Sequence, residues 1–210
     1  ESLGSVPEPD AGHRESFVQV IIKNANQMNH LLDNLLQLAR LEANSVRQVQ
    51  AGVDVRKALD RAWEICAPLA QEQEVSLHIE FGLHEIWVAA DPEQLVQVWV
   101  NLLDNALKYG PARSWIRAWA EERERKWILA LQDNGPGIEP GQQERIFERF
   151  YRGRSGQESK EVSGSGLGLA ICRHILANNN RRIWVQSPAP DTMQGSVFYF
   201  SLPQADDTAE

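Results

Sequence analysis

The sequence contains few cysteines and no long apolar run, and both absences narrow the possibilities. Cys66 and Cys172 are the only two cysteines among 210 residues. They stand far apart in apolar helical patterns without a Cys-x-x-Cys spacing, so we expect buried free thiols rather than a disulfide or a metal site. No stretch approaches the roughly 18 apolar residues that a membrane-spanning helix requires, and no signal peptide is visible.

These absences suit a reducing cytoplasm. We therefore expect a cytoplasmic location and no membrane segment within this sequence. The first residue is Glu1 rather than Met, which suggests a fragment. Any anchor in the inner membrane would then belong to a longer parent chain.

The sequence also lacks an excess of basic residues. It has 21 Lys and Arg against 29 Asp and Glu, a net charge of -8. Binding to nucleic acid needs clustered cations without many intervening acids, so this balance argues against nucleic acid as a partner. No Gly-Lys pair occurs, which excludes a Walker A phosphate-binding loop. Any phosphate chemistry must therefore be local.

Two different patterns divide the chain. Residues 1–16 are punctuated by proline and glycine, which predicts a loop. Apolar residues then recur at spacings of three and four, which predicts a long amphipathic helix over residues 15–44. The stripe consists of Val18, Ile21, Ala25, Met28, Leu32, Leu35 and Ala39, widened by Leu31, Leu38 and Leu41. It needs partner helices, either in a bundle between subunits or within its own domain.

From residue 53 onward, helices and strands are mixed, without an internal repeat. Asp91-Pro92-Glu93 supplies an N-cap, a proline in the first turn and an early acid, which opens one of the helices. The pattern predicts helices over residues 56–72, 91–109 and 167–178, and strands over residues 75–81, 86–90, 115–121, 127–132, 183–187 and 196–202. Hairpin-paired strands with helices grouped between them favour an α+β fold, a two-layer α/β sandwich whose helices cover one face of a mixed sheet.

Polar residues gather on one face of the helix that follows Asp91. Asn101, Asn105 and Lys108 lie at positions i, i+4 and i+7, while apolar residues occupy the opposite face. An Asn oxygen can complete the oxygen shell of Mg²⁺, and a lysine can reach a phosphate. A solvated polar face is the plainer alternative for this cluster taken alone.

A second cluster, residues 133–137 with the sequence DNGPG, follows a predicted strand. Asn-Gly between strands is a hairpin signal, yet Pro136 and Gly137 extend the segment beyond a two-residue turn. A carboxylate at Asp133, followed by glycines that admit a flat ligand, could accept from an exocyclic amine such as that of adenine.

The third cluster, residues 164–168 with the sequence GSGLG, opens a predicted helix. Free backbone N–H groups at a helix start form a phosphate cradle, although a flexible linker is the alternative. It is not a dinucleotide fingerprint, because Leu169 takes the place of the third glycine.

The fourth cluster, residues 146–152 with the sequence IFERFYR, is an aromatic turn that leads into a polar segment over residues 153–163. Arg149, Arg152 and Arg154 could stabilise phosphate charge from a closing lid. Phe147 and Phe150 are expected to be packing anchors.

These four segments, in this order and spacing, resemble the N, first glycine, F and second glycine boxes of sensor histidine kinases. NHLLDNLLQLARLEA, from Asn29, is similar to the end of the second helix of their dimerisation hairpin. The resemblance implies the ATP-binding sandwich shared with DNA gyrase, mismatch-repair and chaperone ATPases. It divides the chain into a hairpin helix with its leading loop (1–47), a catalytic domain (48–205) and a tail (206–210).

The resemblance also implies roles for individual residues. Asp133 would read the adenine amine, Asn105 would hold Mg²⁺, and Arg152 would act from the lid. Asn101, Lys108 and Tyr109 would contact the phosphate region. The pocket would be completed by Gly135 and Gly137 at the adenine and by Gly164, Ser165, Gly166, Leu167 and Gly168 along the phosphates.

Two features depart from the family pattern. None of the five histidines lies in the family's phosphoacceptor box, a His followed by an acid and then by Arg and Pro. His84-Glu85 comes closest, but it continues into a predicted strand. Residues 178–181 read NNNR where the family often has two glycines, and Asn tolerates the left-handed backbone better than most residues.

The resemblance therefore implies phosphoryl transfer from Mg·ATP to a histidine on an absent helix, and then to an aspartate of a response regulator. The partners would be ATP, a second copy bound through the hairpin helix, and that regulator. An ATP-sensing module that does not transfer phosphate and an ATP-driven clamp remain alternatives. The stimulus, the regulator and the upstream sensor are not encoded here.

Overall fold

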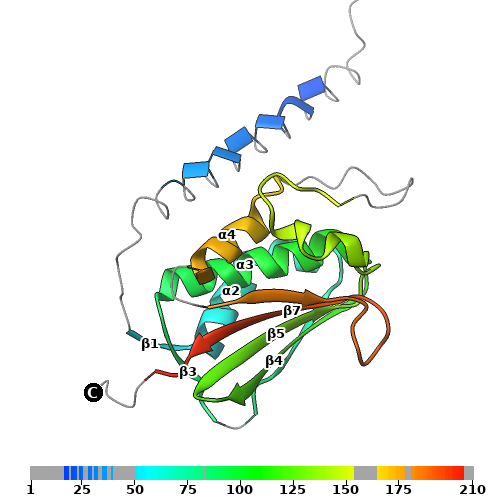
Figure 1. Ribbon diagram of the computed structural model, residues 1–210. Coiled ribbons are helices and arrows are strands. Elements are labelled where there is room, and N and C mark those ends of the chain that lie inside the picture. The colour runs from blue at the N-terminus through cyan, green and yellow to red at the C-terminus, as the bar shows by residue number, and fades with distance from the viewer. Residues whose placement is uncertain are drawn as a thin grey trace, which may run out of the picture.

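The computed structural model describes residues 51–82, 84–153, 165–177 and 181–205, with scattered residues between positions 17 and 39 (Figure 1). The scattered residues are all helical, which confirms the helix prediction at those positions. Their exposed apolar side chains are Phe17, Val18, Val20, Ile21, Ile22, Met28, Leu32, Leu35 and Leu36. None of the described helices is long and apolar enough to cross a bilayer.

The main sheet has five strands in the order β2, β4, β5, β7, β6. Their bounds are Ser76–Glu80 (β2), Trp115–Arg123 (β4), Lys126–Asp133 (β5), Ile183–Gln186 (β6) and Ser196–Pro203 (β7). Only β2 and β4 run parallel, and the other pairs are antiparallel. The predicted mixed sheet and its strands are confirmed, with shifts of one or two residues at their ends.

A second, two-stranded sheet pairs β1 (Ala51–Asp54) with β3 (Trp87–Ala90). No strand was predicted at β1, because this four-residue segment has an early glycine and its partner lies more than thirty positions away. β3 begins at Trp87, one residue later than predicted. His84 and Glu85 lie in the loop before it.

Three α-helices lie on one face of the main sheet (Figure 1). They are α2 (Val55–Glu72), α3 (Pro92–Tyr109) and α4 (Gly168–Ala177). Asp54 caps α2 by accepting from the backbone N–H groups of Arg56 and Lys57, and Asp91 caps α3 by accepting from that of Gln94. The predicted sandwich, with helices on one face, is therefore confirmed.

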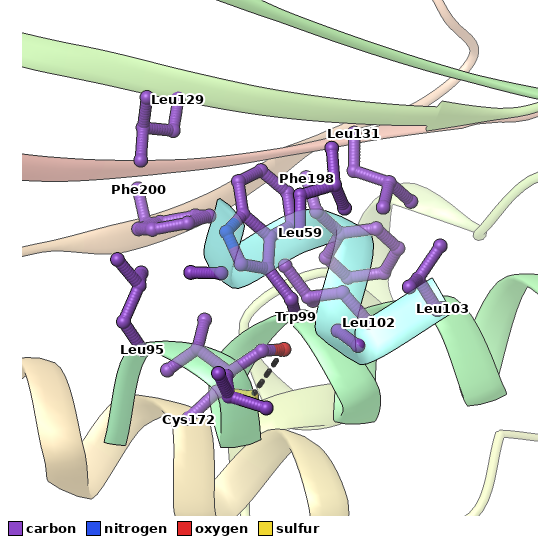
Figure 2. Close-up of a cluster of buried hydrophobic side chains, with 14 of the residues drawn as sticks. Leu59, Leu95, Trp99, Leu102, Leu103, Leu129, Leu131, Cys172, Phe198 and Phe200 are labelled. Carbon is purple, nitrogen blue, oxygen red and sulfur yellow. Dashed lines mark hydrogen bonds between the residues drawn. The ribbon is translucent and has the colours of Figure 1, made fainter. Parts of the chain in front are cut away.

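The core between helices and sheet is built by alternating residues of β5 and β7 (Figure 2). Trp99 of α3 is fully buried, and its ring meets Phe200 edge-to-face at 4.9 Å. Both cysteines are buried free thiols, as predicted. Burial raises the pKa of Cys66 to about 11 and that of Cys172 to about 12, so neither thiol is poised to react.

Two short 3-10 helices, η1 (Pro140–Gln142) and η2 (Arg145–Phe147), connect β5 to the aromatic turn. The predicted loop 1–16, tail 206–210 and asparagine turn 178–180 lie outside the described residues. The division of the chain at residues 47 and 205 remains a prediction.

Candidate functional site

The DNGPG segment leaves the sheet where β5 ends, which excludes the plain hairpin. β5 pairs with β4 and β7, and the chain continues from Gly137 toward η1 instead of returning as a strand. Gly135 is buried against the end of α3: a Cβ built there would lie 3.4 Å from the Tyr109 carbonyl oxygen and 3.6 Å from the Gly110 Cα. The DNGPG segment therefore packs directly on the end of α3, the helix that carries the polar face with Asn101, Asn105 and Lys108.

Asp133 occupies the last position of β5 and is largely buried. Its carboxylate accepts from the Gly135 backbone N–H at 2.8 Å. Burial raises the pKa of this carboxyl to about 6, although backbone hydrogen bonds from Gly135 and Ser196 oppose the increase. The group is therefore ionised at pH 7, as an acceptor for an amine donor should be.

The polar face of α3 is confirmed, but its members are engaged in different ways. Asn101 accepts from the Gln97 side chain at 3.1 Å and donates to the Gly168 carbonyl at 3.2 Å. Its amide therefore joins α3 to the start of α4. Lys108 forms a 2.7 Å ion pair with Asp104, a residue that the sequence analysis did not single out.

Asn105 lies between these two groups and is half-buried. Within the described part of the chain, its side-chain amide has no hydrogen-bond partner. Tyr109, at the end of the helix, is 39% exposed, and so its ring is open to a ligand. This face of α3 thus presents the Asn105 amide, which has no hydrogen-bond partner among the described residues, beside the Lys108 ammonium, which is paired with Asp104.

The glycine-rich segment is described from Ser165 onward, and Gly164 lies outside the described residues. The Ser165 hydroxyl accepts from the Leu167 backbone N–H at 3.2 Å, and Leu167 is fully buried. Gly166 has a φ of +68°, the left-handed region that glycine tolerates best. α4 begins at Gly168, as predicted within one residue, so the helix start is confirmed over the linker alternative.

The aromatic turn packs against this segment. The Phe150 backbone N–H donates to the Gly166 carbonyl at 2.9 Å, and a Cβ at Gly166 would lie 2.9 Å from the Phe150 carbonyl carbon. Phe147 is buried and meets Phe198 edge-to-face, as expected of an anchor.

The prediction that Phe150 is also an anchor is wrong. Its side chain is 58% exposed, and its backbone has a φ of +61°. The turn needs this residue's backbone for the contact with Gly166, and the left-handed conformation leaves the ring in solvent. Arg149 and Arg152 are exposed nearby, and Arg154 lies outside the described residues.

Behind Asp133 lies a supporting contact that was not predicted from the sequence. The Ser187 hydroxyl accepts from the Ile138 backbone N–H at 2.7 Å and donates to the Gly195 carbonyl at 2.9 Å. Gly195, with a φ of +73°, lies so close to β5 that a Cβ there would be 2.0 Å from the Asp133 carbonyl oxygen. In the sequence, the only sign of this contact was Gly195, which stands directly before the strand predicted over residues 196–202.

Comparison with known proteins agrees with this arrangement. A family model described as "Histidine kinase-, DNA gyrase B-, and HSP90-like ATPase" matches residues 90–206. The adaptive-response sensory kinase SasA of Synechocystis sp. is 44% identical over 200 residues, which cover 94% of this chain and 50% of that protein. The phytochrome-like protein Cph1 of Synechocystis sp. is 35% identical over 191 residues, which cover 90% of this chain and 24% of that protein. The chain thus spans half of SasA and about a quarter of Cph1.

Solved structures show the same fold. Full-length ShkA, in complex with AMPPNP, superposes with a TM-score of 0.73 at 26% identity, covering 94% of this chain and 40% of that one. The mycobacterial sensor histidine kinase MprB gives a TM-score of 0.63 at 26% identity and covers 73% of this chain and 98% of that one. The chain therefore belongs to the histidine kinase-, DNA gyrase B- and HSP90-like ATPase family, and its domain is of the type found in sensor histidine kinases.

Proposed function

We propose that this domain binds Mg·ATP between the ends of α3 and β5 and the start of α4, and transfers the γ-phosphoryl group to a histidine. The observation that carries the proposal is the meeting of polar clusters from distant parts of the sequence. Asn101 reaches Gly168, 67 positions away, and Gly135 packs on Tyr109. The sensory kinase SasA, which is similar along most of this chain, and the structure of ShkA in complex with AMPPNP support the same interpretation.

The adenine end would lie at Asp133. Its carboxylate is ionised above pH 6 and can accept from the exocyclic amine. Gly135 and Gly137 would shape the adenine pocket through their backbone, because both positions are too closely packed to accept a side chain. A Cβ at Gly137 would lie 2.9 Å from the Ser187 hydroxyl, so a side chain there would disturb the segment.

The phosphate end would lie between α3 and α4. The backbone N–H groups of Ser165, Gly166, Leu167 and Gly168 precede or open α4, where a helix terminus favours anions. Lys108, which is paired with Asp104, would reach the phosphate region from the end of α3. Arg152, exposed at the edge of the segment that leads toward α4, would offset charge as phosphate transfers.

The residues present also fit a magnesium ion. Asn105 offers an amide oxygen that no described residue uses, on the face between Asn101 and Lys108. Mg²⁺ would neutralise charge on the phosphate oxygens when bound. The chain's own groups would then hold the γ-phosphate in line for attack, which requires the reacting atoms about 3 Å apart.

The acceptor would be a histidine on the first dimerisation helix, outside this sequence, and the phosphoryl group would pass on to an aspartate of a response regulator. A ThkA structure contains such a regulator, TrrA, and its 19% identity to this chain supports the fold alone. The helical stripe between residues 17 and 39 would dock the missing helix and a second copy. Its exposed apolar side chains are those that such a bundle would cover. We place this reaction in the cytoplasm.

The test is transfer of labelled γ-phosphate from ATP, with and without a polypeptide that carries the first dimerisation helix. We expect ATP binding by this chain alone, no label on it, and acid-labile label on the added helix. Asn105→Ala is the matched control that should abolish the label. Binding without transfer would indicate an ATP sensor, and phosphate release without an acceptor would indicate a clamp. Acid-stable label on this chain would overturn the proposal in favour of a Ser or Thr kinase.

A further inference from the structure

The sheet face opposite the α-helices carries a buried polar network. Gln132 belongs to β5, immediately before Asp133, and its side chain is fully buried. Its amide oxygen accepts from the Arg117 guanidinium at 2.6 Å, and its amide nitrogen donates to Asp191 at 2.8 Å and to Thr192 at 3.4 Å. A buried amide with these partners is satisfied at both ends, which defines its orientation.

This network fastens the β6–β7 loop, residues 187–195, to the sheet. Asp191 pairs with Arg117 as well as with Gln132. The Arg117 guanidinium lies 4.8 Å from the centre of the Trp119 ring. Ala189 of the same loop packs on Ala130 and Val197, next to Trp119 and Tyr199. The loop is therefore held against the sheet by the polar contacts of Asp191 and by the apolar contacts of Ala189.

The far end of that loop lies directly on the backbone that carries the proposed adenine contact. A Cβ at Gly195 would lie 2.0 Å from the Asp133 carbonyl oxygen and 2.9 Å from the Asn134 Cα. Gly195 also accepts from the Ala189 N–H at 3.2 Å and from the Ser187 hydroxyl at 2.9 Å. Ser187 in turn accepts from Ile138, the residue after Gly137. A shift of the loop would therefore move the segment 133–138.

We propose that Gln132 and Asp191 are positioning residues, which hold the β6–β7 loop across the sheet and thereby fix the Asp133 backbone for adenine recognition. The proposal rests on the proposed function for the identity of the ligand. Neither residue touches the ligand itself. Supporting residues of this kind matter because a recognition group must be held within about 0.5 Å of its productive position.

The test uses Asp191→Ala, because Asp191 is exposed and does not belong to the hydrophobic core. Glu80→Ala is the matched control. Glu80 is an exposed carboxylate, and together with Asp191 it lines a cavity of ≈ 390 Å³ on this face of the sheet. Affinities are measured for ATP and for purine riboside triphosphate, which lacks the exocyclic amine. We expect about a three- to tenfold loss for ATP in Asp191→Ala, little change for the analogue, and no change in Glu80→Ala.

Two further variants separate positioning from general stability. Asp191→Asn keeps an oxygen acceptor for Gln132 and should recover most of the lost ATP affinity. Gln132→Met keeps the side-chain length but removes the hydrogen bonds, and it should reproduce the selective loss. An equal loss for ATP and the analogue, or no loss for either, would overturn the proposal.

Amide hydrogen exchange makes the result independent of nucleotide binding. Asp191→Ala should accelerate exchange at Gly135, Ile138 and Ala189, and Glu80→Ala should not, because these amides bond within the supported segment. Unchanged exchange at these amides would refute the positioning role, whatever the chain binds. If the wild-type chain bound ATP and the analogue equally, the adenine role of Asp133 would fail, while exchange would still decide the positioning role.

Discussion

Replacement of Gly195 by alanine gives the sharpest test of the geometry behind Asp133. The added Cβ would lie 2.0 Å from the Asp133 carbonyl oxygen and 2.8 Å from its carbonyl carbon. Both atoms belong to the backbone of β5, which pairs with β7 at Asp133 and Ser196. The clash therefore cannot be relieved by rotation of a side chain.

The size of the effect follows from two contributions. A φ of +73° at Gly195 costs an alanine about 1 to 2 kcal/mol. The contact is also more than an ångström too short, so β5 and β7 must separate locally, which adds strain and disrupts hydrogen bonds. We expect a total loss of about 3 to 5 kcal/mol in the free energy of unfolding, with loss of ATP binding.

Two other glycines separate these contributions. Gly82 has a φ of +72° with nothing within 4 Å of its virtual Cβ, so Gly82→Ala should cost only about 1 to 2 kcal/mol. Gly141 has nothing within 4 Å and no positive φ, so Gly141→Ala should change stability by less than about 1 kcal/mol. Urea unfolding and ATP titration would be measured for all three. Equal stability losses for Gly195→Ala and Gly82→Ala would refute the argument from close approach.

Three further predictions concern the nucleotide site. Asp133→Asn presents a donor where the adenine amine needs an acceptor, so ATP affinity should fall about ten- to a hundredfold at unchanged thermal stability; wild-type affinity would remove Asp133 from the site. Asn105→Ala should remove the Mg²⁺ dependence of ATP binding while adenosine binding persists, and an equal loss for both ligands would indicate a structural role. Burial raises the pKa of Asp133 to about 6, so its carboxylate becomes protonated as the pH falls through that value. Adenosine affinity should therefore decrease between pH 7 and pH 5 in the wild type and stay flat in Asp133→Asn, as followed by calorimetric titration.

Local signals predicted much of this fold. The α3 helix was recognisable because Asp91 and Pro92 form a start signal and because apolar residues recur with helical spacing. Its two faces are as expected, with Leu102, Leu103, Ala106 and Leu107 buried. β5 and β7 were recognisable as short apolar runs, residues 127–131 and 197–200, each bounded by polar residues.

Features set by distant contacts were not predictable in this way. β1 has no strong pattern of its own and exists through its pairing with β3. The exposed ring of Phe150 results from a left-handed backbone that serves the contact with Gly166. In the sequence, Gln132 is an ordinary polar residue of a predicted strand. In the structure it is fully buried, because the β6–β7 loop covers it and Asp191 accepts from its amide.

Asn101 shows how a correct location can be combined with a different use. Its place on the polar face of α3 was predicted from the helical spacing, and the resemblance to sensor kinases implied contact with the phosphate region. In the structure, both ends of its amide are engaged, by Gln97 and by the Gly168 carbonyl. A side chain that both accepts and donates is required there, which a carboxylate or an ammonium cannot supply. We infer that Asn101 fixes where α4 begins, and the position of that helix start would determine where a phosphate could meet the backbone N–H groups there.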